Sequence, residues 1–96
     1  MPSAARLGDI ASDHDGAGPT PGIEASQDVA IDGIAAMRQG DDFESHACPD
    51  ESAHRRSLVG GSRSVFINGK PAGRAGDAIS CGGIVTAGST TVFIGD

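Results

Sequence analysis

The apolar runs of this chain are short, and the clearest of them end at glycine. Residues 65–69 read Val-Phe-Ile-Asn-Gly, a β-branched and aromatic run followed by the residue pair that tight hairpin turns prefer. Residues 29–33 read Val-Ala-Ile-Asp-Gly, and residues 92–95 read Val-Phe-Ile-Gly. No stretch combines a convincing helical period with capping residues. The pattern predicts a mainly β chain of short strands with glycine-containing corners.

These strand runs belong to a longer unit that the chain repeats about three times. Each unit has a serine, a strand run and an Arg-x-Gly-Asp turn. The serines are Ser26, Ser62 and Ser89, and the arginines are Arg6, Arg38 and Arg74. In each turn we expect the glycine to take a positive φ and the aspartate to bond its own turn backbone, which is a structural role. The repetition predicts pseudo-threefold symmetry in a single domain over residues 1–96, with no N- or C-terminal extension domain.

The composition leaves little material for a hydrophobic core. The 96 residues include no Trp, no Tyr and three Phe, whereas Gly contributes 15. Small folds with a poor core often add a metal or a partner. We therefore expect this chain to be stabilised by one or the other.

Net charge and hydropathy exclude several functional classes. The formal net charge of −6 argues against binding to nucleic acid or to an anionic membrane surface. No apolar run approaches the ~18 residues of a transmembrane helix, so we expect no stable membrane insertion. No secretory signal precedes the first repeat. The sequence predicts a protein that is made in the cytoplasm and leaves it, if at all, without a cleaved leader.

The histidines and one cysteine follow the repeat. His14 and His46 each lie eight residues after the arginine of their unit, and Cys81 lies seven residues after the third arginine. His54 adds a fourth group from the segment 39–56, which is polar and predicts a loop. Imidazole and thiolate suit Zn²⁺, which takes four tetrahedral ligands in structural sites. The sequence predicts a closed site of three histidines and one cysteine holding one structural zinc per chain.

Alternatives to this ligand set stay open. Cys48 lies two residues from His46 and could replace it or His54 in the metal shell. Iron and copper accept the same ligand types. A single histidine taken alone would be an exposed loop residue, and the two cysteines could instead form a disulfide, which fits a leaderless protein poorly.

No catalytic motif is present. The chain lacks Gly-x-Ser-x-Gly, a P-loop, a dinucleotide fingerprint and His-Glu-x-x-His. A closed metal site also leaves no position for a reactive water. We expect no enzymatic activity.

At these residues the chain resembles the PAAR-repeat family. The family name describes a Pro-Ala-Ala-Arg unit, which occurs here as Pro-Ala-Gly-Arg at residues 71–74 and as Ala-Ala-Arg at residues 4–6. The fuller pattern of the family resembles residues 61–77, 80–83 and 88–95, and the resemblance covers nearly the whole chain, most loosely at residues 34–38 and 42–58. It implies a small cone of short β-strands with a structural zinc near its apex. The three histidines and one cysteine of the family carry over onto His14, His46, His54 and Cys81.

The resemblance also implies a function. It predicts a non-enzymatic tip that caps the trimeric, VgrG-type β-helical spike of a type VI secretion system, one chain per trimer, and sharpens it for membrane puncture. Effector proteins are further candidate partners. The protein would be cytoplasmic before firing and then be secreted through the contractile apparatus without a signal peptide. The tip of a phage tail spike and a free-standing zinc-binding module are the alternative functions.

The three strand runs are the expected contacts with such a spike, because a trimer needs three similar edges. The candidate partner-binding residues are Val29, Ile31, Val65, Ile67, Val92 and Ile94.

Overall fold

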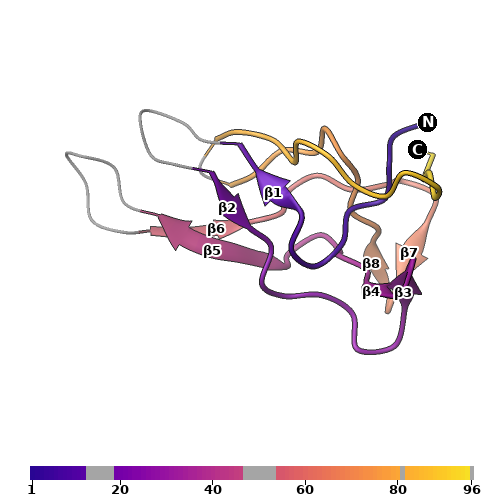
Figure 1. The fold of residues 1–96 in the computed structure, drawn as a ribbon. Coiled ribbons are helices and arrows are strands. Elements are labelled where there is room, and N and C mark those ends of the chain that lie inside the picture. The colour runs from indigo at the N-terminus through magenta and orange to yellow at the C-terminus, as the bar shows by residue number, and fades with distance from the viewer. Residues whose placement is uncertain (13–18, 47–53, 81, 96) are drawn as a thin grey trace.

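The computed structural model describes residues 1–12, 19–46, 54–80 and 82–95, and for residues 46, 54 and 55 it describes the backbone (Figure 1). These residues form eight short strands and no helix, so none of them belongs to a helix that could cross a membrane. The prediction of a mainly β chain is confirmed. The strands are β1 (Ile10–Ala11), β2 (Thr20–Pro21), β3 (Ala30–Ile31), β4 (Ile34–Ala35), β5 (Asp42–His46), β6 (His54–Ser57), β7 (Phe66–Ile67) and β8 (Lys70–Pro71).

In the described part of the chain, successive strands pair in four antiparallel ladders, β1–β2, β3–β4, β5–β6 and β7–β8. The hairpins β3–β4 and β7–β8 have two-residue turns, as the sequence predicts. Asp32 and Asn68 both have φ 55°, and the glycine after each has φ 77°. Positive φ at both central residues is the requirement of a type I′ turn, and its twist matches that of the strands.

The third strand run pairs with the N-terminal segment. An isolated bridge joins Ser3 to Phe93, and the Ile94 amide donates to the Pro2 carbonyl at 2.8 Å. This bridge occupies the place that β4 and β8 take in the other two units. The two termini consequently lie near each other at one end of the molecule (Figure 1).

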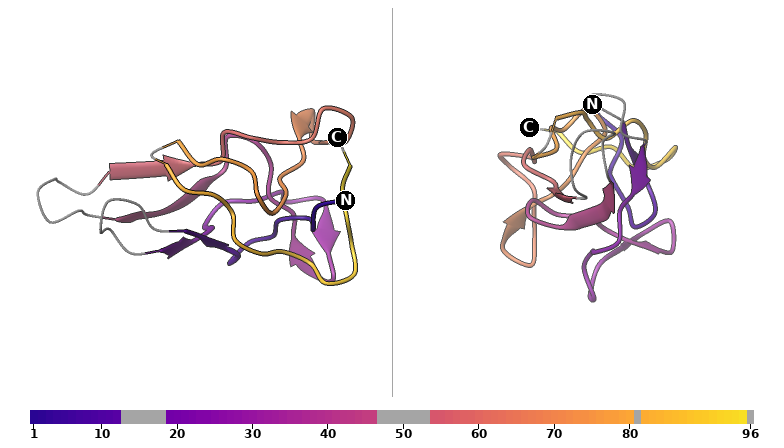
Figure 2. Two further views of the ribbon diagram at one scale, coloured as in Figure 1. Left: turned by 90° about the horizontal axis from the view of Figure 1, so that it is seen from above. Right: turned by 90° about the vertical axis from the view of Figure 1, so that its left-hand side faces the viewer.

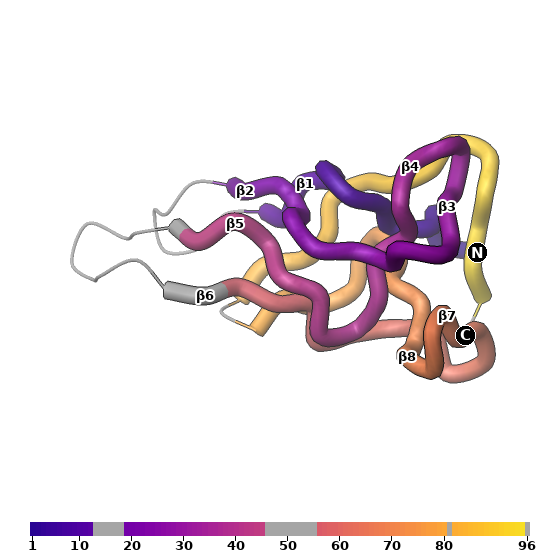
Figure 3. Tube along the Cα trace, turned by 90° about the horizontal axis from the view of Figure 1, so that it is seen from below, coloured from indigo at the N-terminus to yellow at the C-terminus, as the bar shows by residue number. Residues whose placement is uncertain are grey.

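The molecule is elongated, with principal extents of 38 × 24 × 21 Å. We call the end with the hairpins β3–β4 and β7–β8 and the two termini the broad end. We call the opposite end, where β1–β2 and β5–β6 lie, the narrow end. Figures 2 and 3 show β5–β6 running away from the two broad-end hairpins.

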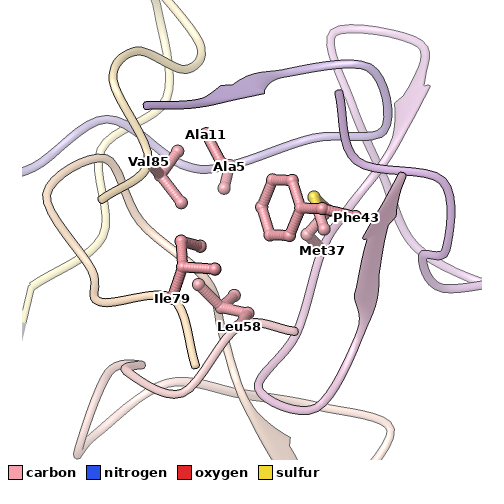
Figure 4. Close-up of a cluster of buried hydrophobic side chains, with 7 residues drawn as sticks. All are labelled: Ala5, Ala11, Met37, Phe43, Leu58, Ile79 and Val85. Carbon is pink, nitrogen blue, oxygen red and sulfur yellow. The ribbon is translucent and has the colours of Figure 1, made fainter. Parts of the chain in front are cut away.

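Among the described residues, two buried clusters form the core. The broad-end cluster takes one alanine and one isoleucine from each unit and contains Ala4, Ile31, Ala36, Ile67, Ala72 and Ile94. The second cluster contains Ala5, Ala11, Met37, Phe43, Leu58, Ile79 and Val85 (Figure 4). Full burial of a side chain such as Phe, Leu or Met contributes about 1.5–3 kcal/mol. The composition therefore supports more of a core than its few large apolar residues suggest.

Three isolated bridges join the units in a ring. Each connects the arginine of one turn to an alanine of another unit, and the pairs are Arg6–Ala36, Arg38–Ala72 and Arg74–Ala4. The bridges join the N-terminal segment to the unit that begins at Ser26, that unit to the one that begins at Ser62, and the unit of Ser62 back to the N-terminal segment. The same contact recurs three times, as pseudo-threefold symmetry requires; the rotation that relates the units stays a prediction.

Candidate functional site

Two of the four predicted metal ligands lie opposite each other on neighbouring strands. His46 ends β5 and His54 begins β6, and they are register partners. The register shifts between Phe43 and His46, where β5 holds one more residue than β6. In a regular ladder that continued from the pair of Phe43 and Arg56, Ser45 rather than His46 would lie opposite His54. Bulges of this kind are common beside functional sites, where they re-aim the chain.

The predicted loop over residues 39–56 is wrong at both ends, because β5 and β6 occupy them. The sequence pattern missed these strands because Phe43 is the one large apolar residue in either. Phe43 and its register partner Arg56 are both buried, at 1% and 0% exposure. A buried arginine in place of an apolar residue hides the alternation that identifies a strand.

The other predicted ligands, His14 and Cys81, lie outside the described residues, as does Cys48. Within the described part of the chain, no group of three or more His, Cys, Asp or Glu side chains could hold a metal. The paired backbones of His46 and His54 do fit a zinc site, because directly opposite residues are the closest neighbours across an antiparallel pair. The four-ligand set stays a prediction.

The Arg-x-Gly-Asp turns are structural, as predicted. In each turn the aspartate accepts a hydrogen bond from the arginine amide, at 2.7, 2.8 and 2.8 Å for Asp9, Asp41 and Asp77. The intervening glycines have φ near 90°. Each aspartate also pairs with the guanidinium of its own turn. The hydrogen bond to Asp41 raises the pKa of Arg38 above its ordinary value.

The residue after each strand run is bound by a neighbouring unit, which sequence reasoning missed. We call these residues, Asp32, Asn68 and Gly95, the corners. Each accepts a hydrogen bond from a repeat serine and lies against a repeat arginine. The serine distances are 2.5 Å for Ser89–Asp32, 2.6 Å for Ser26–Asn68 and 2.9 Å for Ser62–Gly95. The arginine partners are Arg6, Arg38 and Arg74, in the same order.

At two corners, the corner side chain also bonds the residue two places after the repeat serine, and donor and acceptor are exchanged between the two pairs. Thr91 Oγ1 donates to Asp32 Oδ1 at 2.6 Å, and Asn68 Nδ2 donates to Asp28 Oδ2 at 2.9 Å. The Ser89 hydroxyl, followed by the Thr91 hydroxyl, lowers the pKa of Asp32 below its ordinary value, and the charge of Arg6 adds to this. The fixed spacing of the serine before each strand run was the available signal for these corners.

The structure buries some of the residues predicted for partner contact and exposes others. Ile31, Ile67 and Ile94 belong to the broad-end cluster and are 7, 8 and 7% exposed. Val92 packs partly buried against the same cluster. The exposed members of the predicted set are Val29 and Val65, at 37 and 38%.

The middle residue of each run faces outward. Phe66 and Phe93 are 57 and 49% exposed, and Ala30 takes the same position in the first unit. Sequence reasoning missed the two phenylalanines. The period of two in a strand gives the two faces but not which one turns inward.

Buried Arg56 links the described ends of the ligand-bearing segments. Its Nη1 donates to Thr20 Oγ1 at 2.9 Å, and its Nη2 donates to the carbonyl oxygens of Ser12 at 2.5 Å and Gly82 at 3.4 Å. Ser12 and Thr20 flank the segment with His14, and Gly82 follows Cys81 directly. Arg56 itself lies two residues after His54.

Comparison with known proteins identifies one family. The family model for the PAAR motif matches residues 17–87. Two curated relatives are the NAD(P)(+) glycohydrolase toxin Tse6 of Pseudomonas aeruginosa PAO1 and the (p)ppApp synthetase toxin Tas1 of P. aeruginosa UCBPP-PA14. Each is 36% identical over an alignment of 85 positions that covers 80% of this chain. The match spans 20 and 19% of the two toxins, so this chain corresponds to about a fifth of their length.

Proposed function

Because this chain belongs to the PAAR-motif family, we propose that it is a non-enzymatic tip of a type VI secretion spike. The observation that carries the proposal is the family match over residues 17–87, which contains two of the three strand runs and two of the three Arg-x-Gly-Asp turns. The relatives are toxins, but the region they share with this chain is only about a fifth of each. Their named activities are therefore not assigned to it.

The proposed partner is a trimeric VgrG-type spike, with one chain per trimer at the broad end. Support comes from the corners and bridges, which recur three times around that end. Short strands can extend a partner's sheets by adding to their edges. Effector proteins are a second proposed class of partner. The corresponding spike of a phage tail is the alternative partner.

We propose Phe66 and Phe93 as the main contacts with the spike, with Val29 and Val65 beside them. Aromatic residues, Phe among them, are enriched at the cores of protein interfaces. The isoleucines predicted from the sequence would support this surface from inside, because they pack in the broad-end cluster.

A structural zinc is proposed at the narrow end, held by His14, His46, His54 and Cys81. Such a metal would cross-link β5–β6 to the segments with His14 and Cys81 and supply no reactive group. A stiff narrow end suits an apex that is driven into a membrane. The proposed localisation follows the same role, cytoplasmic before firing and then secreted through the contractile apparatus.

The partner proposal is tested by mixing the chain with the trimeric spike protein of the same genome and measuring mass by light scattering after size exclusion. A complex of one chain with three spike subunits is expected. A chain that elutes alone, with readily exchangeable zinc, would instead support the free-standing zinc-binding module.

The metal proposal is tested by mass spectrometry of the native protein and of two matched variants. We expect one zinc per chain, lost in Cys81→Ser and kept in Cys48→Ser. The reverse result would replace Cys81 by Cys48 in the ligand set.

A further inference from the structure

The strongest feature outside the repeats is the buried guanidinium of Arg56. Its residue is 0% exposed, which is unusual for an arginine. Burying a charged group is costly unless hydrogen bonds replace its water. The described partners of Arg56 are the hydroxyl of Thr20 and the carbonyls of Ser12 and Gly82. Each comes from a chain segment distant from β6 in sequence.

The residues around this guanidinium are tightly packed. At Gly83, where φ is 88°, an added Cβ would lie 2.8 Å from Ser12 Oγ and 3.2 Å from Arg56 Nη2. Ser12 is held again by Ile84, whose amide donates to the serine Oγ at 2.9 Å. Arg56 thus lies where residues 10–12 and 82–85 close against β6.

The fork shape of arginine explains why this residue type is used. Its planar guanidinium carries five donors in fixed directions, so one side chain can bond several segments at once. A lysine has one compact ammonium group and cannot reproduce the separate directions of Nη1 and Nη2.

We propose that Arg56 is a positioning residue for the metal centre. It holds the ends of the segments with His14 and Cys81 against β6, which carries His54, before any metal binds. The inference rests on the zinc site proposed above. A guanidinium cannot attract Zn²⁺, because both are cations, so its contribution is geometric. Removing a residue that orients metal ligands typically weakens metal affinity about 10–100-fold.

The test measures zinc affinity by competition with a chromogenic chelator. We expect Arg56→Lys to bind zinc about 10–100-fold more weakly than the wild type. The matched control is Arg38→Lys at the broad end, where Arg38 bonds Asp41 and Asn68. This control also removes an arginine fork but leaves the hydrogen bonds to Ser12, Thr20 and Gly82 in place, so its zinc affinity should equal that of the wild type. In the metal-free protein, Arg56→Lys should also increase hydrogen exchange at the Ile84 amide.

A milder variant keeps the proposal testable where Arg56→Lys does not fold. Thr20→Val removes one acceptor of the guanidinium with little change in shape, and should weaken zinc binding in the same direction. Wild-type zinc affinity in Thr20→Val and in folded Arg56→Lys would overturn this inference and leave the zinc proposal intact. Tighter zinc binding in Arg56→Met would also overturn it, since charge repulsion would then outweigh positioning. A wild-type chain that binds no zinc would overturn the proposed metal centre itself.

Discussion

Replacing Asn68 by aspartate should destabilise the protein, although aspartate occupies the equivalent corner of the first unit. Asn68 Nδ2 donates to Asp28 Oδ2 at 2.9 Å, and its Oδ1 accepts from Ser26 and Arg38. Asn68→Asp keeps the acceptor but puts a second carboxylate oxygen where the donor was. The corner of Asp32 avoids this conflict, because Thr91 stands there in place of Asp28 and donates.

The expected loss follows from three contributions. A hydrogen bond to a charged group contributes about 1.5–3 kcal/mol, and the exposed corner favours the lower limit. Two carboxylates whose charges lie about 4 Å apart repel by about 1 kcal/mol in water. The new attraction to Arg38 returns about 0.2–1 kcal/mol, as exposed ion pairs do. The net loss is about 2 kcal/mol, or a fall in Tm of roughly 8–16 °C for a domain of this size.

The decisive measurement is a double-mutant cycle by urea unfolding at neutral pH and fixed zinc. Asn68→Asp combined with Asp28→Thr recreates the pair of Asp32 and Thr91. We expect the double variant to recover about half or more of the loss. High salt should shrink the effect of Asn68→Asp, because part of it is charge repulsion. Equal stability of Asn68→Asp and the wild type, or no coupling between the two positions, would refute this account of the corners.

Three further predictions concern other parts of the fold. Because the pKa of Asp32 is lowered in the folded protein, its carboxylate stabilises the fold above the ordinary carboxyl pKa. This stabilisation is lost as the pH falls through the pKa of the folded state. Urea midpoints measured down to about pH 2 should therefore fall less for Asp32→Asn than for the wild type. Phe66→Ala should weaken spike binding by about 2 kcal/mol, measured by biolayer interferometry, whereas Ala30→Phe should tighten it; no effect of either would exclude the outward positions as contacts. Gly88→Ala should cost about 1–3 kcal/mol, because its Cβ would overlap the Ala4 carbonyl, while the control Gly95→Ala should unfold like the wild type.

The sequence predicts the parts of this fold that local chemistry determines. Asp-Gly and Asn-Gly identify the two hairpin turns, because few other residue pairs take positive φ twice. The Arg-x-Gly-Asp turns are equally local, since donor and acceptor lie three residues apart. Both were predicted correctly from short stretches.

The parts that the sequence did not reveal depend on distant contacts. β5 and β6 are polar strands that exist because they pair with each other and bury Phe43 and Arg56. The register shift before His46 leaves no mark in the sequence. The predicted metal site could be named from repeat spacing, but the contribution of Arg56 could not, because its described partners are 26 to 44 residues away.

The corners show which features a repeat must keep and which can vary. Asp32, Asn68 and Gly95 differ in charge and size, yet each offers one oxygen to a serine and an arginine, and Gly95 does so with its backbone carbonyl. The ring therefore requires an acceptor oxygen at each corner, but the type of side chain at the corner can vary. The outward positions differ, because the proposed partner would touch their side chains directly. On a trimer with three equal edges, Ala30, Phe66 and Phe93 would meet three equal sites. Because alanine is much smaller than phenylalanine, Ala30 would fill its site least. On the proposed symmetric spike, a ring that is regular in its backbone would therefore dock with two strong contacts and one weak contact, the weak one at Ala30.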